Sequence, residues 1–187
     1  MQTAPTPRVN RGPAAAAENR RALIAAAREV YAEGGLGAPF SAVAKRAGVG
    51  QGSLYRHFPD RTALAVAVFE ENVADLEAYT ADRQRTVDDL LDRVVDQAVS
   101  STALIELITA DINDPRVQPL GKRFGAVVSA LVARERAAGR IGDHIDADDV
   151  NMAVGMLATE LARADAASRP AVARRARALF RAAFAPR

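Results

Sequence analysis

Apolar side chains recur along most of the chain at the three- and four-residue spacing of an amphipathic α-helix. Leu23, Ala27 and Val30 mark one such face, and Gly34 and Gly35 provide a left-handed stop after it. No segment alternates apolar and polar residues in the way a half-buried strand does. The pattern predicts an all-α protein of about nine helices, with short helices first and a longer bundle after them.

The pattern divides the chain into three regions. Residues 1–13 contain three prolines and two arginines without apolar periodicity, which predicts a disordered basic arm. We expect a first domain at 14–62 and a second at 63–187. After a first helix that ends near Gly34, further helices are expected at about 39–47, 51–57, 60–83, 87–99, 102–110, 115–139, 147–164 and 170–184.

Residues 39–58, PFSAVAKRAGVGQGSLYRHF, combine two short helices with a tight glycine-containing turn, AGVG. Each helix is too short to be stable alone. Val43 and Leu54 give the two helices inward faces, while the outer face of the second keeps an amide, hydroxyls, a guanidinium and an imidazole. Such side chains suit phosphates and base edges. This arrangement predicts a helix-turn-helix, whose second helix enters the major groove of DNA.

The same segment resembles a known family. AVAKRAGVGQGSLYRHFPDRTAL is similar to the TetR-family pattern IA-x-x-AGVS-x-GTLY-x-HF-x-x-K-x-x-L, and RALIAAAREVYAEGG resembles that family's first helix. The resemblance covers about residues 18–70. It implies a homodimeric, ligand-responsive transcriptional regulator in the cytoplasm, most simply a repressor, that binds a pseudo-palindromic DNA operator and has no catalytic role or cofactor.

The resemblance assigns DNA contacts position by position. They fall to the residues Ser41, Lys45, Gln51, Gly52, Ser53, Tyr55, Arg56, His57 and Arg61. The pattern is departed from at three positions: Pro39 stands where Ser or Thr often caps the helix, Gly50 replaces a frequent Ser, and Arg61 replaces Lys.

Charge and composition limit the alternatives. Residues 1–62 carry nine Arg or Lys and four Asp or Glu, a net +5, whereas the remainder carries sixteen and nineteen, a net −3. A basic head on a mildly acidic body favours contact of one end with a polyanion. The absence of cysteine excludes disulfides, thiol nucleophiles and thiolate metal sites. No apolar run is long enough to span a membrane, so we expect a soluble intracellular protein and no membrane partner.

Three segments contain residues that are also found in catalytic, phosphate-binding or metal sites. Ser53 and His57 share a helix face, but no acidic residue is placed to orient the histidine as a general base. The glycines at 48, 50 and 52 lack the preceding strand of a phosphate-binding loop. The acidic run around His144 fits a solvated loop that caps the next helix better than a metal cage. We therefore expect neither catalysis nor a metal.

The last two helices are apolar on more than one face. We expect them to pair with a second copy as a four-helix dimer interface, although both faces could instead be interior. The expected interface residues are Val154, Leu157, Leu161, Val172, Leu179 and Phe180.

An effector site is expected where carboxylates interrupt apolar runs, because a buried carboxylate needs a partner. A ligand's donor or cation supplies one, although pairing with a nearby arginine or an exposed position explains either residue equally well. The expected ligand residues are Glu106, Leu107, Phe124, Val128, Met152, Met156 and Glu160. The competing class of protein is an all-helical small-molecule-binding or enzymatic bundle that does not act on DNA.

Overall fold

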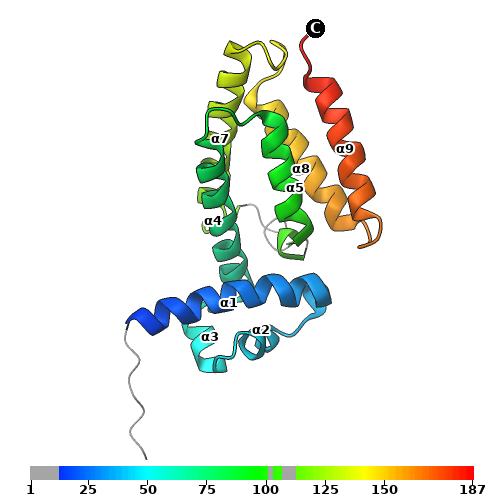
Figure 1. Cartoon of the computed structure of the whole chain (residues 1–187). Helices are drawn as coiled ribbons and strands as arrows, with labels where there is room; N and C mark the ends of the chain where they lie inside the picture. Colours follow the sequence, from blue (N-terminus) through cyan, green and yellow to red (C-terminus); the bar gives the residue numbers. More distant parts are fainter. Residues whose placement is uncertain (1–12, 101–102, 107–112) are drawn as a thin grey trace, which may run out of the picture.

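The computed structural model describes residues 13–100, 103–106 and 113–187, and the regular structure in these ranges is helical (Figure 1). The predicted all-α fold is confirmed. The helices are α1 (Pro13–Gly34), α2 (Phe40–Arg46), α3 (Gln51–His57), α4 (Arg61–Thr80), α5 (Val87–Ser100), α7 (Gln118–Ala137), α8 (Ala147–Arg163) and α9 (Arg169–Phe184), with a 3₁₀ turn, η1, at Gly35–Gly37.

Most predicted helices lie within a few residues of the observed ones. The α1 helix starts at Pro13, the last residue of the expected arm, because proline is well suited to a first helical turn. The rest of that arm lies outside the described residues. Of the helix expected at 102–110, the structure describes only 103–106, which are helical.

The first helices form a compact head. Figure 1 shows α1 lying across the lower end of the molecule, with α2 and α3 beneath it. Leu23, Val43 and Leu54 have no exposed surface, and they pack with Leu64 from the start of α4. The same core also contains Leu104, so a segment far along the chain closes the head.

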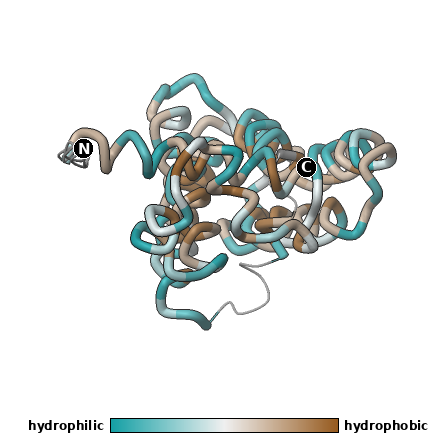
Figure 2. Tube along the Cα trace, turned by 90° about the horizontal axis from the view of Figure 1, so that it is seen from below, coloured by the Kyte–Doolittle hydropathy of each residue, from teal (hydrophilic) through white to brown (hydrophobic). Residues whose placement is uncertain are grey.

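The α4 helix belongs to both parts of the molecule. Its first half, to Val68, packs in the head, and its second half packs through Val73 and Leu76 in the bundle of α4, α5, α7, α8 and α9. Viewed from the head, the hydrophobic stretches of the chain run through the interior, with hydrophilic stretches largely around them (Figure 2). A displacement of α4 therefore moves side chains in both cores.

Two aspartates set where long helices begin, as the sequence predicts. The Asp60 carboxylate accepts a hydrogen bond of 2.7 Å from the Ala63 amide and so caps α4. The Asp146 carboxylate caps α8 by accepting from the amides of Asp148 and Asp149, and the Asp149 carboxylate accepts in turn from the Asp146 amide. Within the described ranges, no helix is both long enough and apolar enough to cross a membrane.

An ion-pair cluster ties the head to the bundle beside the first of these caps. Arg116, just before α7, donates to both Asp60 and Asp114, at 2.9 and 2.6 Å. The Ala63 amide and Arg116 hold the pKa of Asp60 below its ordinary value, and Arg116 lowers the pKa of Asp114 to about 2.

Candidate nucleic-acid interface and cavity

The turn between α2 and α3 is set by one glycine. Gly48 has a φ of +67°, in the left-handed region that glycine enters without strain. The Val49 amide then bonds back to the Ala44 carbonyl at 3.0 Å, which closes the turn. The two short helices are thereby held at a fixed angle, as a helix-turn-helix requires.

Two buried side chains anchor α3 to the head. Leu54 is fully buried and Phe58 nearly so, which turns the opposite side of the helix to solvent. Gln51, Gly52, Tyr55 and Arg56 are exposed there, and Ser53 and His57 are half-buried. The structure thus brings the expected α3 residues together on one short helix.

An aromatic pair joins the outer faces of α2 and α3. The Tyr55 ring meets the Phe40 ring edge-on at 5.5 Å between centroids, although 52% of Tyr55 remains exposed. This geometry is favourable for aromatic rings and reduces the freedom of the tyrosine. From α2, Lys45 is exposed and Ser41 is half-buried.

Only part of the positive charge of the head is available to a polyanion. Arg46 in α2 is held by two α1 carboxylates, Glu29 at 2.8 Å and Glu33 at 2.7 Å, and its hydrogen bond lowers the pKa of Glu33. No described residue forms an ion pair with Lys45 or Arg56. These two cations are therefore the available ones beside α3.

Arg61 makes contacts in the free chain that the sequence does not predict. Its guanidinium donates to the carbonyls of Leu36 and Ala38, at 2.5 and 2.9 Å, and the side chain is half-buried. An arginine is all donor, and these unpaired loop carbonyls are acceptors within its reach. In the free chain Arg61 holds the connection between α1 and α2, so we do not include it among the phosphate contacts.

A cavity of about 580 Å³ lies in the bundle between α4, α5, α7 and α8. Its walls are mostly apolar, with Phe69, Leu76, Phe124 and Val154 among the lining residues. That volume and lining are typical of small-molecule sites. The polar residues at the cavity are Asn72, Gln97, Gln118 and Lys122.

The expected ligand residues are mostly elsewhere. Phe124 lines the cavity, but Val128 is buried in the adjoining core, and Leu107 lies outside the described residues. Glu106, Glu160, Met152 and Met156 are exposed on the chain, the methionines by 61% and 57%. The expectation of buried carboxylates is wrong because both lie on helix faces turned away from the cores.

The interface expected on α8 needs the opposite correction. Leu157 and Leu161 are buried within the chain against α5 and α9, and Val154 lines the cavity. Val172 and Phe180 are half-buried against the same chain, whereas Leu179 is 62% exposed. The two apolar faces predicted on α8 are present, but the face expected at the interface packs largely within the chain and the other face is exposed.

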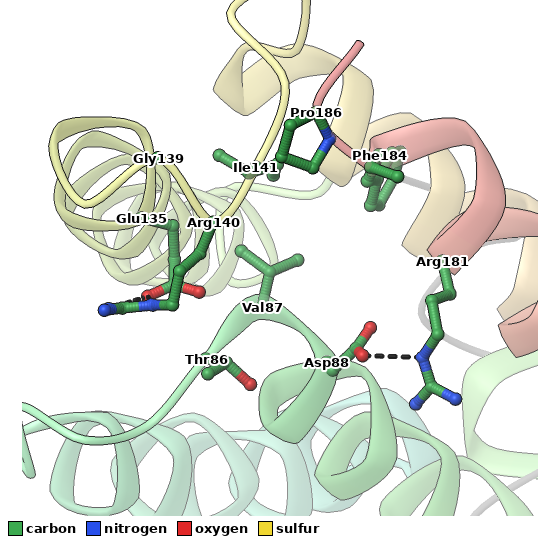
Figure 3. A pocket seen from close by; sticks show the side chains of 11 residues that line it. Thr86, Val87, Asp88, Glu135, Gly139, Arg140, Ile141, Arg181, Phe184 and Pro186 are labelled. Carbon is green, nitrogen blue, oxygen red and sulfur yellow. Dashed lines mark hydrogen bonds and ion pairs between the residues drawn. The ribbon is translucent and has the colours of Figure 1, made fainter.

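A second cavity, of about 420 Å³, lies at the end of the bundle opposite the head (Figure 3). The four charged side chains that line it form two ion pairs (Figure 3). Asp88 accepts from Arg181 at 2.7 Å, and Glu135, which is buried, accepts from Arg140. Each charged side chain of this cavity therefore already has a partner within the protein, and we assign the cavity no ligand.

The sequence reasoning missed Asn72 and Gln97. Asn72 is a buried polar residue in the apolar stripe that contains Phe69 and Leu76, which is the signal that identifies it. Gln97 donates to the Asn72 main-chain oxygen at 3.1 Å and to the Asp75 carboxylate at 2.9 Å. Together they place amide groups beside the large cavity.

The geometry so far defines a class of protein, a helix-turn-helix DNA-binding protein with a helical bundle. Residues 23–68 match the family model described as bacterial regulatory proteins, tetR family. A solved TetR transcriptional regulator from Streptomyces coelicolor is 27% identical, with 89% of this chain and 98% of that chain covered and a TM-score of 0.66. A TetR regulatory protein from Mycobacterium vanbaalenii is 23% identical, with coverages of 92% and 98% and a TM-score of 0.65.

A comparison with curated proteins gives no match. The family match at the head and the likeness in fold over the whole chain agree with the resemblance in the sequence. Residues 23–68 carry the DNA-binding domain of TetR-family regulators, and the chain as a whole has the fold of solved TetR regulators.

Proposed function

We propose that this regulator is a cytoplasmic repressor that binds a pseudo-palindromic operator as a homodimer and leaves it when a small molecule fills the bundle cavity. The observation that carries the proposal is the pairing of an anchored recognition helix with a separate, mostly apolar cavity, joined by α4. A ligand that changes the shape of the cavity acts on a helix that also forms the core of the head.

On DNA, the residues of α3 divide into two groups. Gln51 and Arg56 are exposed on the outer face and are the proposed readers of base edges. Ser53, Tyr55 and His57 are the proposed phosphate contacts, together with Lys45 from α2. Gly52 has open space where a Cβ would be, which allows the backbone to approach a phosphate.

The proposed dimer forms through the outward face of α8 and α9. Met152, Met156 and Leu179 are large apolar side chains left more than half exposed on these two helices. Small residues on the same outward face, Gly155 and Ala182, allow close approach of a second copy. A two-fold pairing of this surface produces a four-helix interface and places two recognition helices on one duplex.

The test is selection of binding sites from a random pool of DNA duplexes. We expect the protein to enrich a pseudo-palindrome and to bind it with an affinity that falls steeply as salt rises, since phosphate contacts release counterions. The variant Arg56→Ala should lose preference for the selected site. Enrichment of no sequence, with no salt-sensitive binding to any duplex, favours the competing class, a helical bundle that acts on small molecules alone.

A further inference from the structure

One buried polar side chain at the large cavity is only half satisfied. Asn72 is 5% exposed, and its Oδ1 accepts a 2.7 Å hydrogen bond from Nη1 of Arg28 in α1. Its Nδ2 is buried and has no hydrogen-bond partner within the described ranges. Buried donors are nearly always paired in folded proteins, so an unpaired one at a cavity indicates a missing acceptor.

The orientation of the Asn72 amide follows from its partner. A guanidinium has only donors, so the atom that it contacts must be the amide oxygen. Arg28 also donates to Glu71 at 3.1 Å and to the Val68 carbonyl at 3.3 Å, which holds it on this side of α4. The Nδ2 group is therefore the unpaired end of a side chain that lines the large cavity and also a smaller polar pocket beside Arg28.

The other polar groups of the cavity have different positions. Gln97 already donates from Nε2 to the Asn72 main chain and to Asp75. Gln118 and Lys122 are exposed, at the rim. A charged ligand group in the interior would find no buried counter-charge among the described lining residues, and burying an unpaired charge is strongly unfavourable.

We propose that the cavity binds an uncharged, mainly apolar molecule that carries an oxygen acceptor, and that Asn72 links this ligand to the head through Arg28. The ligand oxygen accepts from Nδ2, while Oδ1 of the same amide holds α1. The proposal rests on the proposed function, because it specifies the effector class and the route by which the effector acts.

The coupling has a simple physical basis. A hydrogen bond made by one end of an amide polarises the other end and fixes its rotamer, so an occupied cavity strengthens the bond between Asn72 and Arg28. The ligand then favours the orientation of α1 on α4 in which that bond is made. A ligand shifts the DNA equilibrium only if the DNA-binding orientation differs in this contact, and the linkage is reciprocal.

The ligand class is tested with two probes of nearly equal shape, benzophenone and diphenylmethane, which differ in the carbonyl. We expect the wild-type protein to bind benzophenone about tenfold more tightly by calorimetry, the value of one hydrogen bond. Val154→Phe, which fills the cavity, should abolish binding of both. Equal affinity for the two probes, or no saturable binding of either, overturns the ligand class.

The role of Asn72 is tested by Asn72→Asp, which keeps an oxygen for Arg28 and removes the donor. The preference for benzophenone should disappear while DNA binding is kept. If circular dichroism shows that this variant does not fold, the nearly isosteric Asn72→Leu tests the donor through the probe preference alone, because it also removes the oxygen that holds Arg28. A retained preference in the folded variant excludes Asn72 as the donor.

The link to the head is tested by Arg28→Met, with Arg83→Met as the matched control at an exposed position. On the selected duplex, benzophenone should weaken DNA binding of the wild type and of the control, whereas Arg28→Met should bind benzophenone and keep its DNA affinity. Release by Arg28→Met, or no release from the wild type, overturns the link. Failure of DNA binding itself, by contrast, counts against the proposed function and leaves the probe preference as a separate result.

Discussion

At the scale of single residues, substitution of Gly52 should change the stability of the fold and the affinity for DNA in opposite directions. It lies in the first turn of α3, and a Cβ added there meets nothing within 4 Å in the described chain. We expect Gly52→Ala to stabilise the folded protein by about 0.5–1 kcal/mol, because alanine loses less backbone entropy in a helix. The same methyl group should weaken binding to the selected duplex by blocking phosphate approach.

The matched control for that variant is Gly125→Ala in α7, where an added Cβ also finds open space. It should raise stability to urea without changing DNA affinity. If Gly52→Ala binds DNA as the wild type does, the backbone of α3 does not approach a phosphate at this position.

A second prediction at this scale distinguishes positioning from reading. Lys45→Ala should weaken binding to every duplex alike and reduce the slope of log affinity against log salt by about 0.9, the value of one phosphate contact. Gln51→Ala should instead narrow the gap between the selected and random duplexes by about 1–3 kcal/mol. Fluorescence anisotropy over a salt series measures the salt slope and the specificity of each variant. Loss of specificity in Lys45→Ala, or a uniform loss of affinity in Gln51→Ala, would contradict the proposed roles.

Residue identity alone predicts the α3 surface well and Arg61 poorly. The inward positions Leu54 and Phe58 follow from helical spacing, and their burial determines which α3 side chains face outward. The partners of Arg61 are carbonyls of a loop 23 and 25 residues away in sequence. Every residue has a main-chain carbonyl, so the sequence does not show which carbonyl accepts a hydrogen bond from an arginine, and only the fold does.

At the scale of elements, α8 and α9 provide a pair of opposite outcomes. Leu179→Asp alters a side chain that is exposed on the single chain, so we expect a folded monomer that has lost operator binding. Leu161→Asp puts a charge into a fully buried site between α5, α8 and α9, so we expect an unfolded protein.

Analytical ultracentrifugation and circular dichroism distinguish these results. A dimeric Leu179→Asp protein at micromolar concentration would place the interface elsewhere. A folded Leu161→Asp protein would contradict the packing described for α8.

Helical periodicity shows that α8 has two apolar faces but not which face meets which neighbour. Both stripes contain side chains of similar size, and only the packing of α5 and α9 against Leu157 and Leu161 decides between them. Capping is more local and therefore more predictable. The Asp146 caps of α8 depend on residues two and three positions away, which the sequence displays directly.

At the scale of the whole molecule, acid should loosen the attachment of the head. The Ala63 amide and Arg116 depress the pKa of Asp60 below its ordinary 3.8, and Arg116 brings that of Asp114 to about 2. A carboxylate with a depressed pKa contributes stability that is complete above the unfolded-state value. This contribution should be lost as the pH falls from about 4 towards 2.

Urea unfolding at pH 6, 4 and 3 measures this effect. Arg116→Gln should be less stable at pH 6 and should lose less stability on acidification than the wild type. Arg136→Gln, at an exposed position with no ion pair in the described chain, should retain the wild-type pH dependence. Parallel curves for the wild type and Arg116→Gln would exclude the cluster as the source.

The all-α architecture follows from the sequence because periodicity and glycine stops are local signals. The cavity does not follow, since it is the space left where four helices fail to fill their common interior. Its walls come from residues 69 to 158, and no spacing rule brings Phe69, Ile105 and Val154 together. Asn72 alone carries a hint, as a polar interruption of an apolar stripe.

The segment at residues 103–106 has a consequence for how this sequence can change during evolution. Leu104 is buried in the head core, while the next residue, Ile105, packs with α5, α8 and α9 and lines the cavity. One residue inserted between them turns Ile105 by roughly a further 100° about the helix axis relative to Leu104, so that the two side chains cannot both stay in their cores. The cavity walls are free to diverge by substitution as new ligands are selected, but the chain length between these neighbouring residues is not.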